Sequence, residues 1–410
     1  MRWRIAILVS AAIAISYLDR QTLPVAIKAI SQEISLTNEQ FSSLQSAFLL
    51  AYALLYAGGG RLVDLLGTRR GFTLIMIFWS IACASHALAT NFIMLAASRF
   101  LLGVGEGGGF PAATRTVAEW FPTQERATAM GIINAGTAVG AVAAPPLIAL
   151  VLTYANWRWI FTLTGGFGLL WAAWWWVSYS APEEPSTLSE KDSASAPALP
   201  WTCLFSVRET WGLVTAKFLS DAAWYFYLFW LPKYLYDARS FDIKAVGTFA
   251  WLPNAAAGIG CLVAGAFSSY LVRRRFSLGI ARKVALGMSA GLMPLVILIP
   301  HVPVSWAIGL FCVAYFGQQS WSTLVMVLPA DLFPQTVVGS VAGLVGFGGA
   351  LGGIVFGQCV GYLLDHGAGY APVFAIAGML HVIAFLIIVA AVPVVAPLQL
   401  EPKLSFEGVR

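Results

Sequence analysis

Charged side chains are scarce in this sequence of 410 residues. Only 10% of the residues are Asp, Glu, Lys or Arg, whereas 59% are hydrophobic. A soluble domain carries about 25% charged residues, so this composition excludes a soluble enzyme, a nucleic-acid-binding protein and a disordered chain. The apolar residues fill long runs, and a bilayer core about 30 Å thick requires roughly 20 helical residues per crossing. The chain therefore has room for about twelve membrane crossings.

Cysteine and histidine are also few, and neither forms a cluster. The four histidines are scattered, and the five cysteines are Cys83, Cys203, Cys261, Cys312 and Cys359. Their spacing matches neither a disulfide framework nor a zinc site. No nucleophile–base pair or nucleotide-binding loop stands between the apolar runs. We therefore expect a protein that is not an enzyme and that uses no metal or cofactor.

Basic residues gather beside the ends of the apolar runs. Placing both termini in the cytoplasm leaves sixteen Lys and Arg side chains on that side and five outside. Because positive charge is retained on the cytoplasmic face of membrane proteins, the net charge of +5 requires no nucleic-acid partner. The first apolar run resembles a signal peptide but has no small-residue cleavage site, so we predict a retained first helix. The counts predict an even number of crossings with both termini cytoplasmic.

Twelve apolar runs predict an all-α membrane protein. They cover residues 5–27, 41–61, 72–91, 93–115, 126–152, 158–180, 210–232, 244–268, 281–300, 303–330, 336–362 and 371–395. The stretch 181–200 is rich in Pro, Ser, Ala and acidic residues, which is typical of a solvated linker. We predict an N-terminal six-helix bundle (1–180), a cytoplasmic linker (181–209), a C-terminal six-helix bundle (210–395) and a cytoplasmic tail (396–410).

The two halves repeat each other weakly at an offset of 212 residues. Residues 119–140 align with residues 331–352, and the repeat places Gly131, Gly136 and Gly140 on Gly343, Gly348 and Gly352. Duplicated six-helix units are found in transporters whose substrate site lies near the membrane midplane between the halves. The repeat therefore predicts transport by alternating access.

Ionisable residues interrupt two of the predicted helices. Arg99 and Glu106 are seven residues apart, which places them on one face of a helix, two turns from each other. Asp19 and Arg20 lie at a comparable depth in the first helix. A charged side chain at the bilayer centre costs at least ~2.5–3.5 kcal/mol on insertion scales, so these four side chains should face a polar cavity or one another. A purely structural ion-pair network between the two helices is the alternative.

Amide, phenol and indole side chains share faces of three further helices. These residues are Gln45, Phe48, Tyr52 and Tyr56 in the second helix, Lys217, Asp221, Trp224, Tyr225 and Tyr227 in the seventh, and Gln318, Gln319, Trp321 and Ser322 in the tenth. Such groups suit a polyhydroxylated ligand, and aromatic residues are also common at membrane interfaces. Glu106 aligns with Gln318, so we expect charge and proton handling in the first half and hydroxyl recognition in the second. Lys217 and Asp221 are expected to neutralise each other.

A loop with a cluster of charges follows the second helix. Gly60 and Gly67 permit close approach and a tight turn, and Asp64 stands near basic residues such as Arg69. This cluster is predicted to latch the cytoplasmic side of one conformation, or else only to set the topology. The second half holds a decayed copy in which Ser269 replaces the acidic residue.

Several of these segments resemble one family. The loop from Gly60 to Arg69 resembles the signature G-x-x-x-D-x-x-G-x-R of the major facilitator superfamily. The sequence Tyr17-Leu-Asp19-Arg20 and the segments 99–112, 118–141, 225–235 and 331–334 resemble its anion:cation symporter branch, and in particular bacterial hexuronate and aldonate transporters. The resemblance covers nearly the whole chain except the linker and the tail. It implies a major facilitator fold of two six-helix bundles in the bacterial inner membrane, where a monomer suffices.

The resemblance also implies roles for individual residues. It associates Arg99 with the substrate carboxylate, and Asp19 and Glu106 with proton coupling. The other substrate-binding candidates are Tyr17, Arg20, Gln45, Tyr52, Asn134, Tyr225, Gln318 and Gln319. The expected activity is proton-coupled uptake of a hexuronate such as glucuronate or galacturonate, with the proton as the coupling ion.

Other activities stay open at this point. The substrate could be galactonate, glucarate or an aromatic acid, and the protein could be an efflux antiporter or a transporter-like receptor that binds without turnover. The fifth helix lacks the Gly-Pro pair expected of drug/proton antiporters, because Gly140 is followed by Ala141. That difference weakens the efflux interpretation.

Overall fold

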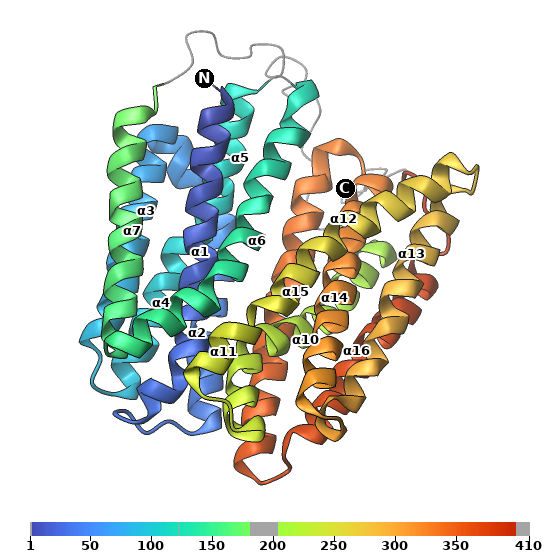
Figure 1. The fold of residues 1–410 in the computed structure, drawn as a ribbon. Coiled ribbons are helices and arrows are strands. Elements are labelled where there is room, and N and C mark those ends of the chain that lie inside the picture. The colour runs from blue at the N-terminus through green and yellow to red at the C-terminus, as the bar shows by residue number, and fades with distance from the viewer. Residues whose placement is uncertain (1, 122, 181–203, 399–410) are drawn as a thin grey trace, which may run out of the picture.

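The structure, a computed structural model, describes residues 2–121, 123–180 and 204–398. These residues form helices and connecting loops, and no strand occurs among them. Figure 1 shows two helical bundles side by side, and the first described residues, from residue 2, lie at the same end of the molecule as the last ones, up to residue 398. We call this end the terminal end and the opposite end the far end.

Twelve helical segments make up the two bundles. The first half contains α1 (Arg2–Ser31), α2 (Asn38–Leu66), α3 (Thr68–Ser85) with η1 (His86–Leu88), α4 (Phe92–Gly107) with α5 (Gly109–Trp120), α6 (Thr123–Tyr154) and α7 (Trp157–Ser178). The second contains α10 (Arg208–Arg239), α11 (Ile243–Phe249) with α12 (Trp251–Arg273), α13 (Leu278–Leu292) with η2 (Met293–His301), α14 (Val304–Leu332), α15 (Gln335–Asp365) and α16 (Tyr370–Ala391). The twelve predicted helices are therefore confirmed. Most of the linker and the tail lie outside the described residues.

Helix ends differ from the prediction where polar residues cap the helix. α2 begins at Asn38, three residues before the predicted start, because the side chain of Thr37 accepts a hydrogen bond from the backbone N–H of Gln40 at 3.1 Å. The side chain of Gln40 accepts one in return from the backbone N–H of Thr37 at 3.1 Å. Such a capping box satisfies donors that have no partner inside the helix. A count of apolar residues does not detect a polar first turn.

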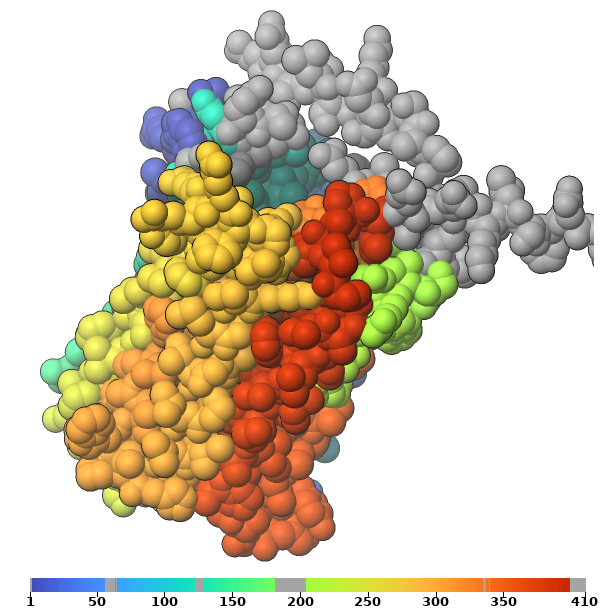
Figure 2. All heavy atoms as spheres, turned by 90° about the vertical axis from the view of Figure 1, so that its right-hand side faces the viewer, coloured from blue at the N-terminus to red at the C-terminus, as the bar shows by residue number. Residues whose placement is uncertain are grey.

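Eight of the described helical segments are long and apolar enough to cross a membrane by length and composition alone. The four segments outside this set are α2, α4 with α5, α10 and α14, and these carry most of the predicted polar site residues. Figure 2 shows the face of the second half that α13, α14 and α16 form. Exposed apolar side chains of η2, which continues α13, and of α16 include Leu295, Leu298 and Leu386. Such a surface suits contact with lipid tails.

The repeat between the halves is confirmed by the way glycines pack against backbone carbonyls. A Cβ atom built on Gly140 of α6 would lie 2.1 Å from the carbonyl oxygen of Ala14 in α1. A Cβ atom built on Gly352 of α15 would lie 1.9 Å from the carbonyl oxygen of Phe218 in α10. Small residues let membrane helices approach this closely. α6 therefore packs on α1 as α15 packs on α10.

The two halves contact each other at the far end (Figure 1). The carboxylate of Asp365, at the end of α15, accepts hydrogen bonds from the backbone N–H groups of Asn38 at 3.0 Å and Glu39 at 2.8 Å. The hydroxyl of Tyr236 donates to the carbonyl of Val25 at 2.8 Å. A carboxylate at a helix N-terminus is stabilised by the helix dipole, so Asp365 caps α2 across the boundary between the halves.

The close packing at Gly352 generates a prediction about stability. We expect Gly352→Ala to lower the melting temperature in detergent, because overpacking a tight contact costs about 1–3 kcal/mol. Gly343→Ala on the same helix is the matched control, since a Cβ atom there meets nothing within 4 Å. Differential scanning fluorimetry of both variants checks this, and equal melting temperatures would contradict it.

Candidate functional site

A buried ion pair joins α1 to α4 in the first half. The Nε atom of Arg20 donates to the Oε2 atom of Glu106 at 2.7 Å, and the hydroxyl of Ser16 donates to the same oxygen at 2.6 Å. Ser16 and Arg20 are four residues apart and therefore share one face of α1. The side chains of Arg20 and Glu106 are 7% and 0% exposed. Glu106 thus pairs with Arg20 and not with Arg99, its neighbour on the same helix.

Asp19 has a different environment, although it is next to Arg20 in sequence. Its side chain points toward α3, where the indole N–H of Trp79 donates to Oδ2 at 2.7 Å. The thiol of Cys83 donates to Oδ1 at 3.4 Å. Asp19 is 1% exposed. The two acidic residues predicted to couple protons are therefore both buried, one held by a cation and one by uncharged donors.

Arg99 is the most deeply buried cation of this cluster. Its side chain is 0% exposed, and none of its three guanidinium nitrogens has a hydrogen-bond partner among the described residues. Its charge lies within electrostatic range of Glu106 and Asp19, and its guanidinium carbon is 5.8 Å from the centre of the Phe48 ring. A buried cation without hydrogen bonds is unfavourable, so Arg99 keeps a strong preference for a negative partner.

Arg20 stands at the boundary between the halves, surrounded by aromatic rings. Its guanidinium carbon lies 4.5 Å from the centre of the Tyr52 ring and 4.9 Å from that of Tyr17, distances typical of cation–π contacts. Tyr52 also hydrogen-bonds to Arg20. Tyr225 of α10 lies within electrostatic range of Arg20, Tyr17 and Tyr52. The structure therefore brings Tyr17, Arg20 and Tyr52 together, and Tyr225 of the second half packs toward α2 beside Leu49.

The second half contains its own buried polar network. The Nζ atom of Lys217 donates to Asp221 at 2.9 Å and to the hydroxyl of Ser322 at 2.8 Å. The amide nitrogen of Gln318 donates to the same carboxylate at 3.4 Å, and the amide oxygen of Gln318 is hydrogen-bonded to His381. The predicted pairing of Lys217 with Asp221 is confirmed. His381 was missed, because a single histidine in an apolar run gives no signal of its own.

Three predicted residues lie apart from these two networks. Gln45 is 4% exposed, and both polar atoms of its amide lack a hydrogen-bond partner among the described residues. Gln319 is half-buried and accepts a weak hydrogen bond from the thiol of Cys261 at 3.6 Å. Asn134 is exposed on α6. Gln45 is the one of the three whose buried amide is free to bind a ligand.

The loop after α2 makes contacts within the first half. Gly67 has φ of +75°, a conformation that favours glycine, and it forms the turn between α2 and α3. Arg69 donates two hydrogen bonds to the backbone carbonyl of Trp176 in α7, at 3.0 and 2.5 Å. Its guanidinium carbon lies 4.6 Å from the centre of the Trp176 ring. The surroundings of Gly60 and the side chain of Asp64 lie outside the described residues. The latch therefore stays a prediction.

Glu119 of α5 is a residue that sequence reasoning missed. Its carboxylate accepts hydrogen bonds from Thr68 at 2.6 Å, Arg115 at 2.9 Å and Tyr179 at 2.5 Å. It thus joins α3, α5 and the end of α7 at the terminal end. Burial, together with the adjacent carboxylate, raises the pKa of the Tyr179 phenol, so this phenol remains a donor.

A counterpart of Glu119 exists in the second half. Asp331 stands 212 residues later and accepts a hydrogen bond from Arg282 at 2.8 Å, while Arg282 also donates to Ser268 at 2.9 Å. The repeated segments 119–140 and 331–352 begin at these two acidic residues, and this alignment could have identified both.

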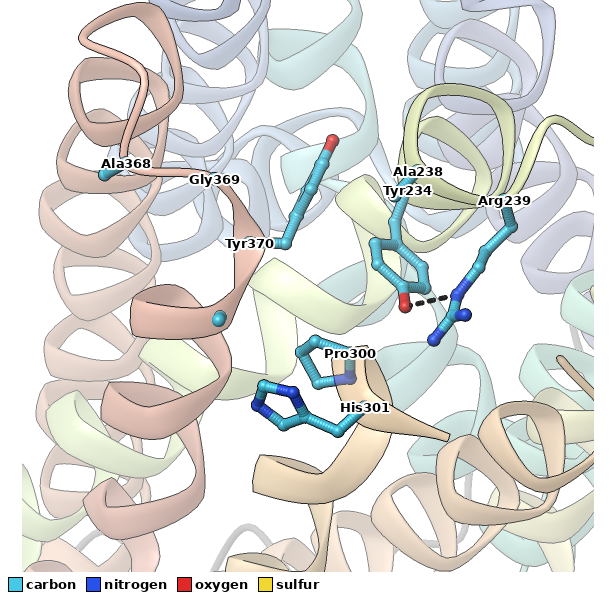
Figure 3. Close-up of a pocket in the computed structure, with 9 residues that line it drawn as sticks. Tyr234, Ala238, Arg239, Pro300, His301, Ala368, Gly369 and Tyr370 are labelled. Carbon is cyan, nitrogen blue, oxygen red and sulfur yellow. Dashed lines mark hydrogen bonds between the residues drawn. The ribbon is translucent and has the colours of Figure 1, made fainter. Parts of the chain in front are cut away.

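A separate cavity of about 440 Å³ lies at the far end of the second half (Figure 3). Its lining includes Tyr234, Arg239, His301 and Tyr370 and none of the predicted site residues. The guanidinium of Arg239 donates to the hydroxyl of Tyr234 at 2.8 Å and also bonds to the carbonyl of Ile299. Arg239 therefore joins the end of α10 to η2. The candidate functional site therefore consists of the two buried networks, around Arg20 and Glu106 and around Lys217 and Asp221, and does not include this cavity.

Comparisons with known proteins agree with this architecture. The family model of the Major Facilitator Superfamily matches residues 9–357. The hexuronate transporter of Escherichia coli (strain K12) is 28% identical, covering 95% of this chain and 93% of that protein. The D-galactonate transporter of Escherichia coli O6:H1 is 29% identical, covering 90% and 91%. A crystal structure of a bacterial homologue of the lysosomal transporter Spinster, inward-facing and unoccupied, superposes with a TM-score of 0.73 at 18% identity over 96% of each chain. This last likeness concerns the fold alone.

The ion pair between α1 and α4 generates a prediction about stability. Arg20→Met leaves the Glu106 carboxylate buried without a charged partner, and we expect it to destabilise the protein by about 3–5 kcal/mol. Adding Glu106→Gln removes the uncompensated charge and should restore most of the loss. Thermal unfolding of wild type, both single variants and the double variant checks this. A double variant as unstable as Arg20→Met would show that the loss has another origin.

Proposed function

Because the chain belongs to the Major Facilitator Superfamily, we propose that it takes up a sugar acid together with protons, and that this acid is a hexuronate such as glucuronate or galacturonate. The protein is a multi-pass membrane transporter and not an enzyme. The proposal depends on one observation above all, the buried pair of Arg20 and Glu106 beside Tyr17 and Tyr52. We further propose a location in the bacterial inner membrane, cytoplasmic termini and a monomeric unit.

The substrate class follows from the chemistry around Arg20. A guanidinium binds a carboxylate through two parallel hydrogen bonds, and phenol groups supply donors and acceptors for sugar hydroxyls. Tyr52, Tyr17 and Tyr225 are the phenols nearest to Arg20, and Gln45 adds a buried amide without partners among the described residues. The hexuronate and galactonate specificities of the relatives support this class of substrate.

Proton coupling follows from competition for Arg20. Glu106 as a carboxylate holds the guanidinium in an ion pair. When Glu106 takes a proton it loses its charge, and Arg20 is then free to bind the substrate carboxylate. The proton on Glu106 offsets the negative charge of the substrate, so that Arg20 binds the substrate without adding an uncompensated charge to a low-dielectric interior. Loss of the proton restores the ion pair and displaces the substrate.

Asp19 and Arg99 complete the charge balance of the first half. Asp19 is bound by Trp79 and Cys83, which are uncharged, so it can exchange a proton without breaking an ion pair. Arg99 lies within electrostatic range of Asp19 and Glu106. In this proposal Arg99 attracts the substrate anion into the first half, and Asp19 is the second proton site.

Alternating access requires that the contacts at the far end break. Asp365 with Asn38 and Glu39, and Gln358 with Ser46 at 2.9 Å, join α15 to α2 there. The conformation described here therefore favours access from the terminal end. Opening the far end separates α15 from α2 and admits substrate from the other side of the membrane.

Transport by purified protein in liposomes tests the function. We expect labelled glucuronate to accumulate when an inward proton gradient is imposed, and a protonophore to abolish the accumulation. Glu106→Gln should retain counterflow exchange, because Arg20 is free, but should lose gradient-driven accumulation, because no proton is carried. Accumulation by Glu106→Gln would exclude Glu106 as the coupling acid.

Absence of glucuronate uptake would exclude the hexuronate. Galactonate, glucarate and an aromatic acid are then tested in the same liposomes. Proton-driven expulsion of a compound from whole cells would instead favour an efflux antiporter, and tight binding without flux would favour a receptor.

The contact between Asp365 and α2 generates a prediction about conformation. We expect Asp365→Ala to increase opening of the far end, because two backbone donors of α2 lose their partner. A cysteine at position 46, in a background without native cysteines, should react several-fold faster with an impermeant maleimide added from that side. Asp237→Ala, an exposed acid at the same end, is the control and should leave the rate unchanged. Equal rates in both variants would remove Asp365 from the gate.

A further inference from the structure

The proposed mechanism makes no use of the ion pair in the second half. Lys217 and Asp221 lie on one face of α10, 2.9 Å apart, and their side chains remain 8% and 9% exposed. A second buried ion pair in an apolar helix is costly unless further hydrogen bonds satisfy its polar atoms. Ser322 and Gln318 supply such hydrogen bonds. The pair is therefore held in a defined position.

The repeat shows where this pair lies relative to the binding residues of the first half. α6 glycines contact the carbonyls of Ser10 and Ala14, and the corresponding α15 glycines contact those of Val214 and Phe218. The helices α1 and α10 therefore correspond at an offset of 204 residues, since 214 − 10 and 218 − 14 both give this value. At this offset the position of Tyr17 corresponds to that of Asp221.

Two contacts agree with this correspondence. Tyr225, one turn after Asp221 on α10, packs toward the first half, since a Cβ atom built on Gly353 of α15 would lie 2.3 Å from its ring and 3.1 Å from the side chain of Leu49 in α2. The Oδ2 atom of Asp221 lies 2.3 Å from the place where a Cβ atom on Gly349 would be, so only glycine leaves room for the carboxylate. Asp221 therefore lies against α15, one turn from a tyrosine that packs beside α2 of the first half.

The charges of the two networks balance. In the first half Arg20 and Arg99 offset Asp19 and Glu106, and in the second half Lys217 offsets Asp221. A substrate with one carboxylate at Arg20 is compensated by one proton on Glu106. In a substrate with a second carboxylate at its other end, that carboxylate would lie near Asp221. The carboxylate of Asp221 already pairs with Lys217. Like charges in a low-dielectric site repel strongly.

We propose that Asp221 is a specificity-determining residue that restricts the substrate to sugar acids with a single carboxylate. It does so by neutralising Lys217, which would otherwise bind a second carboxylate on the last carbon of the sugar acid. This inference rests on the proposed function, namely that the protein carries sugar acids bound at Arg20.

Two compounds that differ only in the second carboxylate test the proposal. Galactonate and galactarate have the same six carbons, and galactarate carries a carboxylate where galactonate carries a hydroxymethyl group. The measurement is inhibition of labelled glucuronate counterflow in proteoliposomes by each compound. For wild type we expect galactonate to inhibit at least tenfold more strongly than galactarate.

Removing the negative charge should change this ratio. Asp221→Asn leaves Lys217 free, and we expect the preference for galactonate to fall tenfold or more. Asp237→Asn is the matched control, because Lys233 and Asp237 form a pair of the same spacing at the far end of the same helix, 2.5 Å apart, and it should keep the wild-type ratio. Lys217→Gln should shift the ratio in the opposite direction, further against galactarate, and this variant tests the proposal even where Asp221→Asn folds poorly.

The outcomes distinguish failure of the proposed function from failure of the specificity proposal. A wild-type protein that exchanges no glucuronate overturns the proposed function, and the inference with it, before any variant is measured. A wild-type protein that exchanges glucuronate but accepts galactarate as well as galactonate overturns the inference alone. Folded Asp221→Asn and Lys217→Gln proteins that both keep the wild-type ratio would also overturn the inference alone.

Discussion

Charge balance inside an apolar bundle is the constraint on which the rest of the structure depends. Asp19, Arg20, Arg99 and Glu106 are buried in the first half, and each would be costly as an isolated charge. The structure meets this cost by joining α1 to α4 through Arg20 and Glu106 and by binding Asp19 to α3. These contacts fix how three helices are rotated about their axes. Because the same contacts carry the charge, a change in protonation also changes what holds the helices together.

The two halves share a backbone arrangement but differ in chemistry. Glycines of α6 and α15 let these helices approach the carbonyls of α1 and α10 in the same manner. At the same depth, however, Glu106 of α4 has Gln318 as its counterpart in α14. The carboxylate binds a guanidinium, whereas the amide joins Asp221 to His381. The two halves therefore share the positions of their helices but differ in the chemical groups that these helices bring together.

Long apolar runs were enough to predict the twelve helices, because each crossing needs a similar number of apolar residues. The identity of the charged cluster was also predictable, since ionised groups in such helices must face inward. The pairing was not, because Arg99 and Glu106 share a helix face, and periodicity within one helix cannot tell which residue of another helix lies opposite. The contact of His381 with Gln318 joins two helices that are distant in sequence, so the residues around either position do not predict it. The polar cap at Thr37 shifted a helix end that hydropathy alone placed later.

The cap that Asp365 provides to α2 has a consequence for the energetics of gating. Its carboxylate accepts hydrogen bonds from the first backbone donors of a helix that belongs to the other half, and these hydrogen bonds are exposed. When the halves part, water can replace the carboxylate on the same N–H groups. Exchange of one hydrogen bond for another changes free energy by only about 0.5–1.5 kcal/mol. In the proposed transport cycle, the contact of Asp365 with α2 would therefore add little to the free energy needed to separate the halves.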